Sequence, residues 1–306
     1  MKVFVTGASG YIGSGIVREL LAAGHQVLGL ARSDTSAASL AAAGAEVHRG
    51  HLNDLDSLRN GAAAADGVIH LAFIHDFSDF DLRGAAQADL HAIETIGAAL
   101  EGSGKPFVIT SGTLMLTFFL PPGRLGTEKD VADPESVAPR IASENATIAL
   151  ARHGVRSSIV RLAPTVHSEW DKHGFVPTLI DIARAKGMSA YVGDGSNRWP
   201  AVYMPDAAHL FRLALEKAPA GSVLHGAGEE GVPFREIAEA IGQQLKLPVV
   251  SIAAEEAGAH FGFLSAFVPA DNPTSNVLTR ELLGWQPEGP GLIADIQQGH
   301  YFNHER

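Results

Sequence analysis

The stretch FVTGASGYIGSGIV, residues 4–17, places three glycines between two apolar segments of different periodicity. Residues 3–5 form a short apolar run rich in β-branched and aromatic side chains, which predicts a buried strand. After the glycines, apolar residues recur at helical spacing from Ile16 to Leu21, and the pattern ends at Gly24. The stretch therefore predicts a strand that turns directly into a helix.

The glycines at this turn suit the binding of a phosphate group. Glycine permits a tight turn and a close approach of backbone to ligand, and the helix N-terminus presents N–H groups and partial positive charge. The stretch HQVLGLA, 25–31, contains a second predicted strand and completes the context that a dinucleotide-binding motif requires. A turn that binds nothing fits that context poorly. The residues that we expect to contact the ligand here are Gly7, Ser9, Gly10, Tyr11, Ile12 and Gly13.

Composition excludes several classes of protein. The chain has 306 residues, and 46% of them are hydrophobic, which argues against disorder. Its net charge of −11 argues against a nucleic-acid partner. The sequence contains no apolar run of about 18–20 residues and no signal peptide before the first strand, so we expect no membrane partner. The absence of cysteine excludes disulfides and a cysteine nucleophile and favours a cytoplasmic location.

The order of predicted elements indicates an α/β fold. Strands at 2–6, 26–31, 45–48, 67–72, 106–110 and 157–161 alternate with helices near 12–23, 35–43, 54–63, 84–102 and 140–153. Such alternation, with continuously apolar strands, predicts a Rossmann-like, doubly wound parallel sheet over residues 1–165. Residues 166–306 are richer in loops, with helices near 175–186, 206–216, 234–244 and 277–283. We expect them to form a smaller substrate-binding lobe, interleaved with the first domain.

Ligands of such sheets lie beyond the C-terminal strand ends. After the second strand, Arg32 and Ser33 occupy the region where an acidic residue would bind the ribose hydroxyls, and arginine suits a 2′-phosphate. This favours NADP over NAD, although Arg32 could be a surface residue and Asp34 could serve NAD.

The next two strand ends provide further expected contacts to the cofactor. His51 and Leu52 follow the third strand and are expected beside the adenine, unless this is a plain turn capped by Asn53 or Asp54. The residues expected along the pyrophosphate and ribose after the fourth strand are Leu71, Ala72 and Phe73.

Five segments together resemble a known family. VTGASGYIG, DGVIHLAF, FVITSGT, IVRLAPTV and VYMPDAAHLFRLALE occur in the order of the extended short-chain dehydrogenase/reductases, the NAD-dependent epimerase/dehydratase family. The resemblance covers nearly the whole chain. It implies hydride transfer at C4 of a nicotinamide, with a Tyr as proton donor or acceptor, a Lys that lowers its pKa and holds the ribose, and a Ser or Thr that orients the substrate oxygen. It also assigns Thr110, Pro164, Thr165 and Val166 to the cofactor site.

The sequence departs from this family at the Tyr-x-x-x-Lys pair. If Glu144 is the Glu that follows the Lys, then Arg140 occupies the Lys position and Ser136 the Tyr position. The four tyrosines stand elsewhere, at 11, 191, 203 and 301. Arginine can hold the ribose but cannot act as a general acid at neutral pH, because a guanidinium does not release its proton. We therefore expect Arg140 to point toward the cofactor ribose; the alternative is a surface Arg paired with Glu135 or Glu144.

Other residues are candidates for the missing chemistry. Ser111 or Thr113 could bond the substrate oxygen, or both could simply cap a strand end. Tyr203 is a candidate acid, although it and Trp199 could be packing or pocket-wall aromatics. His75 and His167 follow strand ends and titrate in a useful range, although each could be structural.

One loop could be mistaken for a metal site. HSEWDKH, 167–173, contains four side chains of metal-ligand type, but their spacing matches no known site. We expect no metal and interpret the loop as a cap on the nicotinamide or a wall of the substrate pocket.

The leading expectation is an NADP-dependent oxidoreductase that acts on a carbonyl or hydroxyl of a small, partly apolar substrate. An epimerase or dehydratase with a tightly held cofactor is the first alternative, and a catalytically silent NADP-binding sensor is the second. A homodimer is possible on this reasoning, and the expected partner is a small-molecule substrate.

Overall fold

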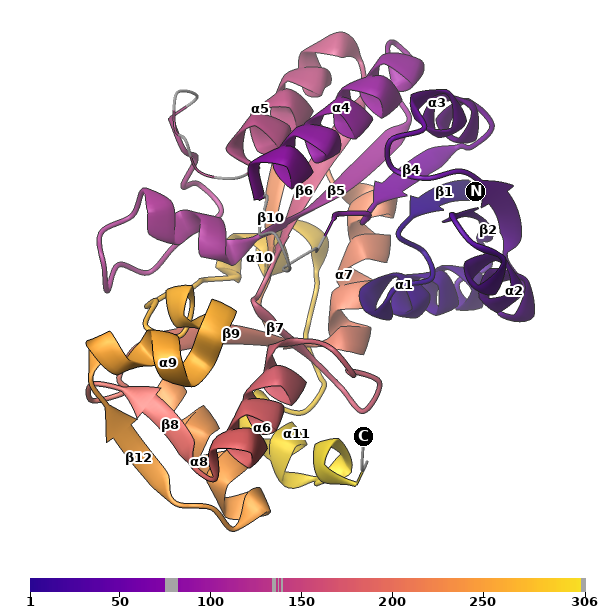
Figure 1. Cartoon of the computed structure of the whole chain (residues 1–306). Helices are drawn as coiled ribbons and strands as arrows, with labels where there is room; N and C mark the ends of the chain where they lie inside the picture. Colours follow the sequence, from indigo (N-terminus) through magenta and orange to yellow (C-terminus); the bar gives the residue numbers. More distant parts are fainter. Residues whose placement is uncertain (75–81, 134–135, 137, 139, 304–306) are drawn as a thin grey trace.

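The computed structural model describes residues 1–74, 82–133, 136, 138 and 140–303 (Figure 1). Its main body is a seven-stranded parallel sheet in the order β10-β6-β5-β4-β1-β2-β3. The strands are β1 (Lys2–Thr6), β2 (Gln26–Ala31), β3 (Glu46–Arg49), β4 (Gly67–His70), β5 (Pro106–Gly112), β6 (Arg156–Leu162) and β10 (Ser222–Gly226). The strand order reverses at β1, which pairs with β2 on one side and β4 on the other. The predicted fold class is thereby confirmed, and the reversal places a ligand crevice at the carboxyl ends of β1 and β4.

Helices cover both faces of this sheet (Figure 1). One face carries α1 (Tyr11–Ala22), α2 (Asp34–Ala42) and α7 (Met204–Lys217), and the other carries α3 (Leu55–Ala63), α4 (Leu82–Leu100) and α5 (Ile141–Leu150). Alternate residues of β1 enter the two cores, with Val3 and Val5 on the α1 side and Phe4 on the α3 side. Burial on both faces explains why these strands are continuously apolar.

The smaller lobe contains two further sheets. Strands β11 (Glu229–Pro233), β9 (Arg198–Tyr203) and β7 (Thr165–His167) form one, and β12 (Val249–Ile252) and β8 (Ser189–Val192) form the other. Four helices surround them: α6 (Phe175–Lys186), α8 (Phe234–Leu245), α9 (Ala257–Phe261) and α11 (Leu292–Gln297). The short strands of this lobe were not predicted from the sequence.

The chain passes between the two parts more than once. After β9, helix α7 packs against α1, and β10 pairs with β6 as an edge strand of the main sheet. Helix α10 (Val277–Leu283) then packs on β10 and α7. Residues after 165 therefore contribute to both parts. In the part of the chain that the structure describes, no helix is both long and apolar enough to span a membrane.

Candidate functional site

The glycine-rich turn is built by close backbone approach. Gly7 has φ +67, and a Cβ there would lie 2.9 Å from the backbone N of Ala72. A Cβ on Gly13 would lie 2.1 Å from the Gly7 carbonyl oxygen. Both positions therefore require glycine. The absence of a side chain at Gly7 lets the turn after β1 pack against the chain that leaves β4. Helix α1 begins without a side-chain cap or an acidic residue in its first turn, so its first N–H groups can donate hydrogen bonds to an anion.

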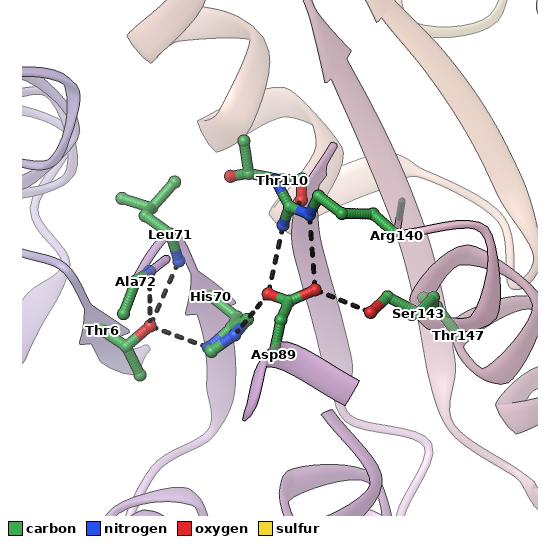
Figure 2. A network of polar contacts seen from close by, with 9 residues as sticks. All are labelled: Thr6, His70, Leu71, Ala72, Asp89, Thr110, Arg140, Ser143 and Thr147. Atoms are coloured by element: carbon green, nitrogen blue, oxygen red, sulfur yellow. Dashed lines mark hydrogen bonds and ion pairs between the residues drawn. The ribbon is translucent and has the colours of Figure 1, made fainter. Parts of the chain in front are cut away.

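Thr6 joins the ends of β1 and β4 (Figure 2). Its hydroxyl oxygen accepts the N–H groups of Leu71 at 3.1 Å and Ala72 at 3.2 Å, and lies 2.8 Å from Nδ1 of His70. The other ring nitrogen of His70, Nε2, lies 3.4 Å from a carboxylate oxygen of Asp89 on α4.

Asp89 is the centre of a buried polar network (Figure 2). Its carboxylate accepts the Oγ hydrogen of Ser143 at 2.7 Å and two hydrogen bonds from Arg140, from Nε at 3.3 Å and from Nη2 at 3.1 Å. Burial opposes its ionisation, but the charge of Arg140 and the hydrogen bonds from His70 and Ser143 outweigh burial and lower the pKa of Asp89 to about 2. Asp89 is thus a carboxylate at neutral pH.

Arg140 lies at the carboxyl edge of the sheet. Its Nη2 also donates to the Thr110 carbonyl at the end of β5, and its guanidinium carbon lies 4.5 Å from the centre of the Phe73 ring, after β4. Its backbone is left-handed, with φ 64 at the residue before α5. The predicted pairing of Arg140 with Glu144 is wrong, because Glu144 pairs with buried Arg161 at 2.6 Å. The other predicted partner, Glu135, lies outside the described residues. Contact of Arg140 with a cofactor ribose stays a prediction.

The edge of β2 and β3 is basic. Arg32 is exposed, and Ser33 caps α2, its Oγ accepting the Ser36 N–H at 3.1 Å. Asp34 is engaged by Arg49, with 2.5 Å between Oδ1 and Nη2. Arg49 ends β3 opposite Ala31 and was missed by the sequence reasoning, although a basic residue that ends a neighbouring strand is a recognisable signal.

The turn after β3 contains the residues expected beside the adenine. His51 is exposed, and Leu52 is partly buried against the core beneath α3. Asp54, rather than Asn53, caps α3, because its carboxylate accepts the Ser57 N–H at 3.0 Å.

The predicted hydroxyl residues differ in their surroundings. Thr113 is fully buried and bonds the side-chain amide of Asn272 at 2.9 Å. Ser111 is also buried, but its hydroxyl finds no hydrogen-bond partner among the described residues. The same holds for the hydroxyls of Thr110 and Thr165. Buried polar groups normally have partners, so these three hydroxyls, two near the end of β5 and one at the start of β7, are candidates for ligand contact. Pro164 and Val166 flank Thr165 in the chain.

The residues assigned to the substrate do not form one cluster. Tyr203 ends β9, donates its hydroxyl hydrogen to Glu169 at 3.3 Å, and has a pKa raised by burial and by Glu169. The His167 ring is 5.8 Å from the Tyr203 ring but is itself buried, with Nδ1 2.9 Å from Asp295. The assignment of Trp199 to the substrate pocket is not supported: it is 1% exposed and packs between Phe175 and Phe234 in the core of the smaller lobe. His75 lies outside the described residues.

The loop 167–173 is held by separate partners. Glu169 accepts from Tyr203, and one oxygen of Asp171 accepts the N–H groups of His173 and Gly174. The described residues contain no group of three or more acidic or histidine side chains arranged to hold a metal ion.

This loop connects the two parts of the molecule. The Tyr11 hydroxyl at the start of α1 lies 2.8 Å from Ser168 Oγ, and the Ser168 N–H donates to the Tyr301 hydroxyl at 3.2 Å. Arg18 of α1 stacks on Trp170 at 4.6 Å. No pattern in the sequence connects Tyr301 with the glycine-rich turn.

A strand-turn-helix built on required glycines, at the point where the order of a parallel sheet reverses, defines a Rossmann-type dinucleotide-binding protein. The family model described as "NAD dependent epimerase/dehydratase family" matches residues 3–225. The chain belongs to this family.

Similar proteins agree with this assignment. The uncharacterized protein C2A9.02 of Schizosaccharomyces pombe is 51% identical over 302 residues, which cover 99% of this chain and 100% of that protein. A 2-alkyl-3-oxoalkanoate reductase of Stenotrophomonas maltophilia is 28% identical over 78% of this chain and 73% of its own. The UDP-glucose 4-epimerase of Thermus thermophilus, solved in complex with NAD, shares the fold, with a TM-score of 0.74, 20% identity, and coverage of 99% of this chain and 100% of that one.

Proposed function

We propose that the chain is an NADP-dependent oxidoreductase that transfers hydride to or from a carbonyl or hydroxyl group of a small, partly apolar substrate. The observation that carries this proposal is the open, glycine-built N-terminus of α1 facing the chain that leaves β4. Such a site binds a pyrophosphate through backbone N–H groups. When bound there, the dinucleotide would supply the hydride to a carbonyl in its reduced form, or accept it from a hydroxyl-bearing carbon in its oxidised form.

The preference for NADP rests on the basic edge of β2 and β3. Arg32 and Arg49 both lie there, and Arg49 engages the carboxylate of Asp34, which would otherwise be the candidate for the NAD ribose hydroxyls. Arginine has the forked donors that match a 2′-phosphate. A dinucleotide with that phosphate therefore suits this edge better than one without it.

The protein's own groups would hold the reacting atoms. Arg140 supplies a fixed positive charge at the ends of β4 and β5. Ser111 is the better candidate to bond the substrate oxygen, because Thr113 is already bonded to Asn272. Tyr203 is protonated and stays the first candidate for a proton donor, although its raised pKa matches neutral pH poorly.

A panel of ketones, aldehydes and alcohols incubated with NADPH or NADP⁺ tests the proposal. We expect cofactor turnover with members of the panel that combine a carbonyl with an apolar chain. The relative named 2-alkyl-3-oxoalkanoate reductase is named for a substrate of this kind. Absence of turnover across the panel, with NADPH binding intact, would favour a sensor.

An epimerase or dehydratase is the second candidate, because the fold is also that of a UDP-glucose 4-epimerase. Such an enzyme reduces and reoxidises its cofactor in one turnover. Cofactor that survives purification, together with product formation without net NADPH consumption, would favour it.

A further inference from the structure

Asp89 is a buried charged group that has no role in the proposed reaction as described above. It lies in the middle of α4 and is fully buried. It accepts hydrogen bonds from Arg140, before α5, and Ser143 of α5, and His70 Nε2 of β4 lies 3.4 Å away (Figure 2). An ionised carboxylate without solvent is retained only where charges and hydrogen bonds replace the water.

The contacts of Asp89 fix the plane of the Arg140 guanidinium. Nε and Nη2 both donate to the carboxylate, and Nη2 also donates to the Thr110 carbonyl. The Phe73 ring covers one face of the group. Nη1 is left without a hydrogen bond among the described residues, and the side chain retains 14% of its exposure.

The other side of the carboxylate is connected to the turn expected to bind the cofactor. His70 Nε2 faces Asp89, and His70 Nδ1 is hydrogen-bonded to the Thr6 hydroxyl. The Thr6 hydroxyl also accepts the N–H groups of Leu71 and Ala72. One continuous set of polar contacts therefore joins the chain that leaves β4 to Arg140.

We propose that Asp89 is a positioning residue, which holds Arg140 in place so that Nη1 can bond the cofactor ribose at the carboxyl ends of β4 and β5. This inference rests on the proposed function, because it assumes a dinucleotide at that edge. Asp89 acts through Arg140 and does not touch the ligand.

A double-mutant cycle in NADPH affinity tests it. Asp89→Asn keeps the shape but removes the charge, and Arg140→Gln removes the guanidinium. We expect each single variant to weaken NADPH binding about tenfold or more, and the double variant to bind no more weakly than Arg140→Gln alone. Two residues that act independently would instead multiply their effects.

Glu144→Gln is the matched control. Glu144 lies on α5 and forms a buried side-chain pair with Arg161. Among the described residues, its only hydrogen bond with Arg140 is from the Glu144 N–H to the Arg140 carbonyl at 3.0 Å, which the substitution retains. Loss of the Glu144 charge should lower thermal stability and leave the Kd for NADPH within about twofold of wild type. Ser143→Ala removes one hydrogen bond from Asp89 and keeps the charge, so it replaces Asp89→Asn if that variant does not fold; we expect it to weaken NADPH binding two- to fivefold.

Three results would overturn the inference: wild-type affinity in the folded Asp89 or Ser143 variant, multiplied effects in the double variant, or an equal loss in Glu144→Gln. If Arg140→Gln weakens NADPH binding in any of these cases, the proposed function stands and only the role of Asp89 fails. A wild-type chain that binds neither NADPH nor NADH would overturn both.

Discussion

The hydroxyl groups of Tyr11 and Ser168 lie 2.8 Å apart and join the start of α1 to the loop after β7. The contact connects the helix expected to bind the pyrophosphate with the lobe expected to bind the substrate. Burial raises the pKa of Tyr11 above its ordinary value, so its phenol stays protonated at neutral pH.

Tyr11→Phe should therefore lower the free energy of unfolding by about 1 kcal/mol, the usual net value of a buried hydrogen bond. Urea unfolding measures it. Tyr191→Phe is the control, since the structure shows no hydrogen bond for the Tyr191 hydroxyl within the described part of the chain. Equal stability of Tyr11→Phe and wild type would show that the contact does not hold the two parts together.

Ser111→Ala and Thr113→Val separate a substrate contact from a structural hydroxyl. Removal of the unpartnered Ser111 hydroxyl should leave stability unchanged or slightly higher and should reduce turnover of NADPH. Thr113→Val removes one hydrogen bond of the buried Asn272 amide and should cost about 1–3 kcal/mol. Denaturation and rate measurements on the same preparations test both; full activity in Ser111→Ala would contradict the assignment.

Asp171 makes stability depend on pH in an unusual direction. Burial raises its pKa to about 6, because one carboxylate oxygen has no partner in the described residues. The pKa of this carboxyl is about 4 in the unfolded chain and higher in the folded one, so the folded state holds the proton more tightly. The resulting stabilisation is fully present below about pH 4 and is lost as the pH rises through about 6. Asp171→Asn cannot titrate. Its stability relative to wild type should therefore increase by about 1 kcal/mol between pH 5 and pH 8. A constant difference measured by urea unfolding across that range would contradict this.

Arg32→Ala tests the preference for NADP. Loss of a charged donor to the 2′-phosphate should weaken NADPH binding about tenfold to a hundredfold and leave NADH binding unchanged. Arg59→Ala is a matched control, because Arg59 is an exposed arginine on α3 that pairs with Asp56. Fluorescence titration measures the affinities, and equal or tighter binding of NADH by the wild type would contradict the role of Arg32.

Much of the main sheet could be predicted because the apolar sequence of each strand by itself indicates a buried strand. Strands 2–6 and 26–31 were placed to the residue, since each is a continuous apolar run bounded by turn residues. The strands of the smaller lobe were missed. They have only three to six residues each, and loop-rich sequence around them shows no periodicity.

The polar site was less predictable because its contacts join residues far apart in the sequence. Asp89 and Arg140 are 51 residues apart, and an acidic residue inside an amphipathic helix normally faces solvent. Trp199 was misassigned because its segment resembles one that runs near the active-site floor in the family. Only its tertiary packing against Phe175 and Phe234 shows that it belongs to the core.

The central claim is that the chain transfers hydride from NADPH to a carbonyl. The most direct measurement uses NADPH carrying deuterium at C4, in turn at each face of the ring, with the carbonyl panel, and follows the label by mass spectrometry. We predict one deuterium in the reduced product from one of the two labelled cofactors, with one NADP⁺ formed per product. Bound NADPH whose label never reaches any product would contradict the claim.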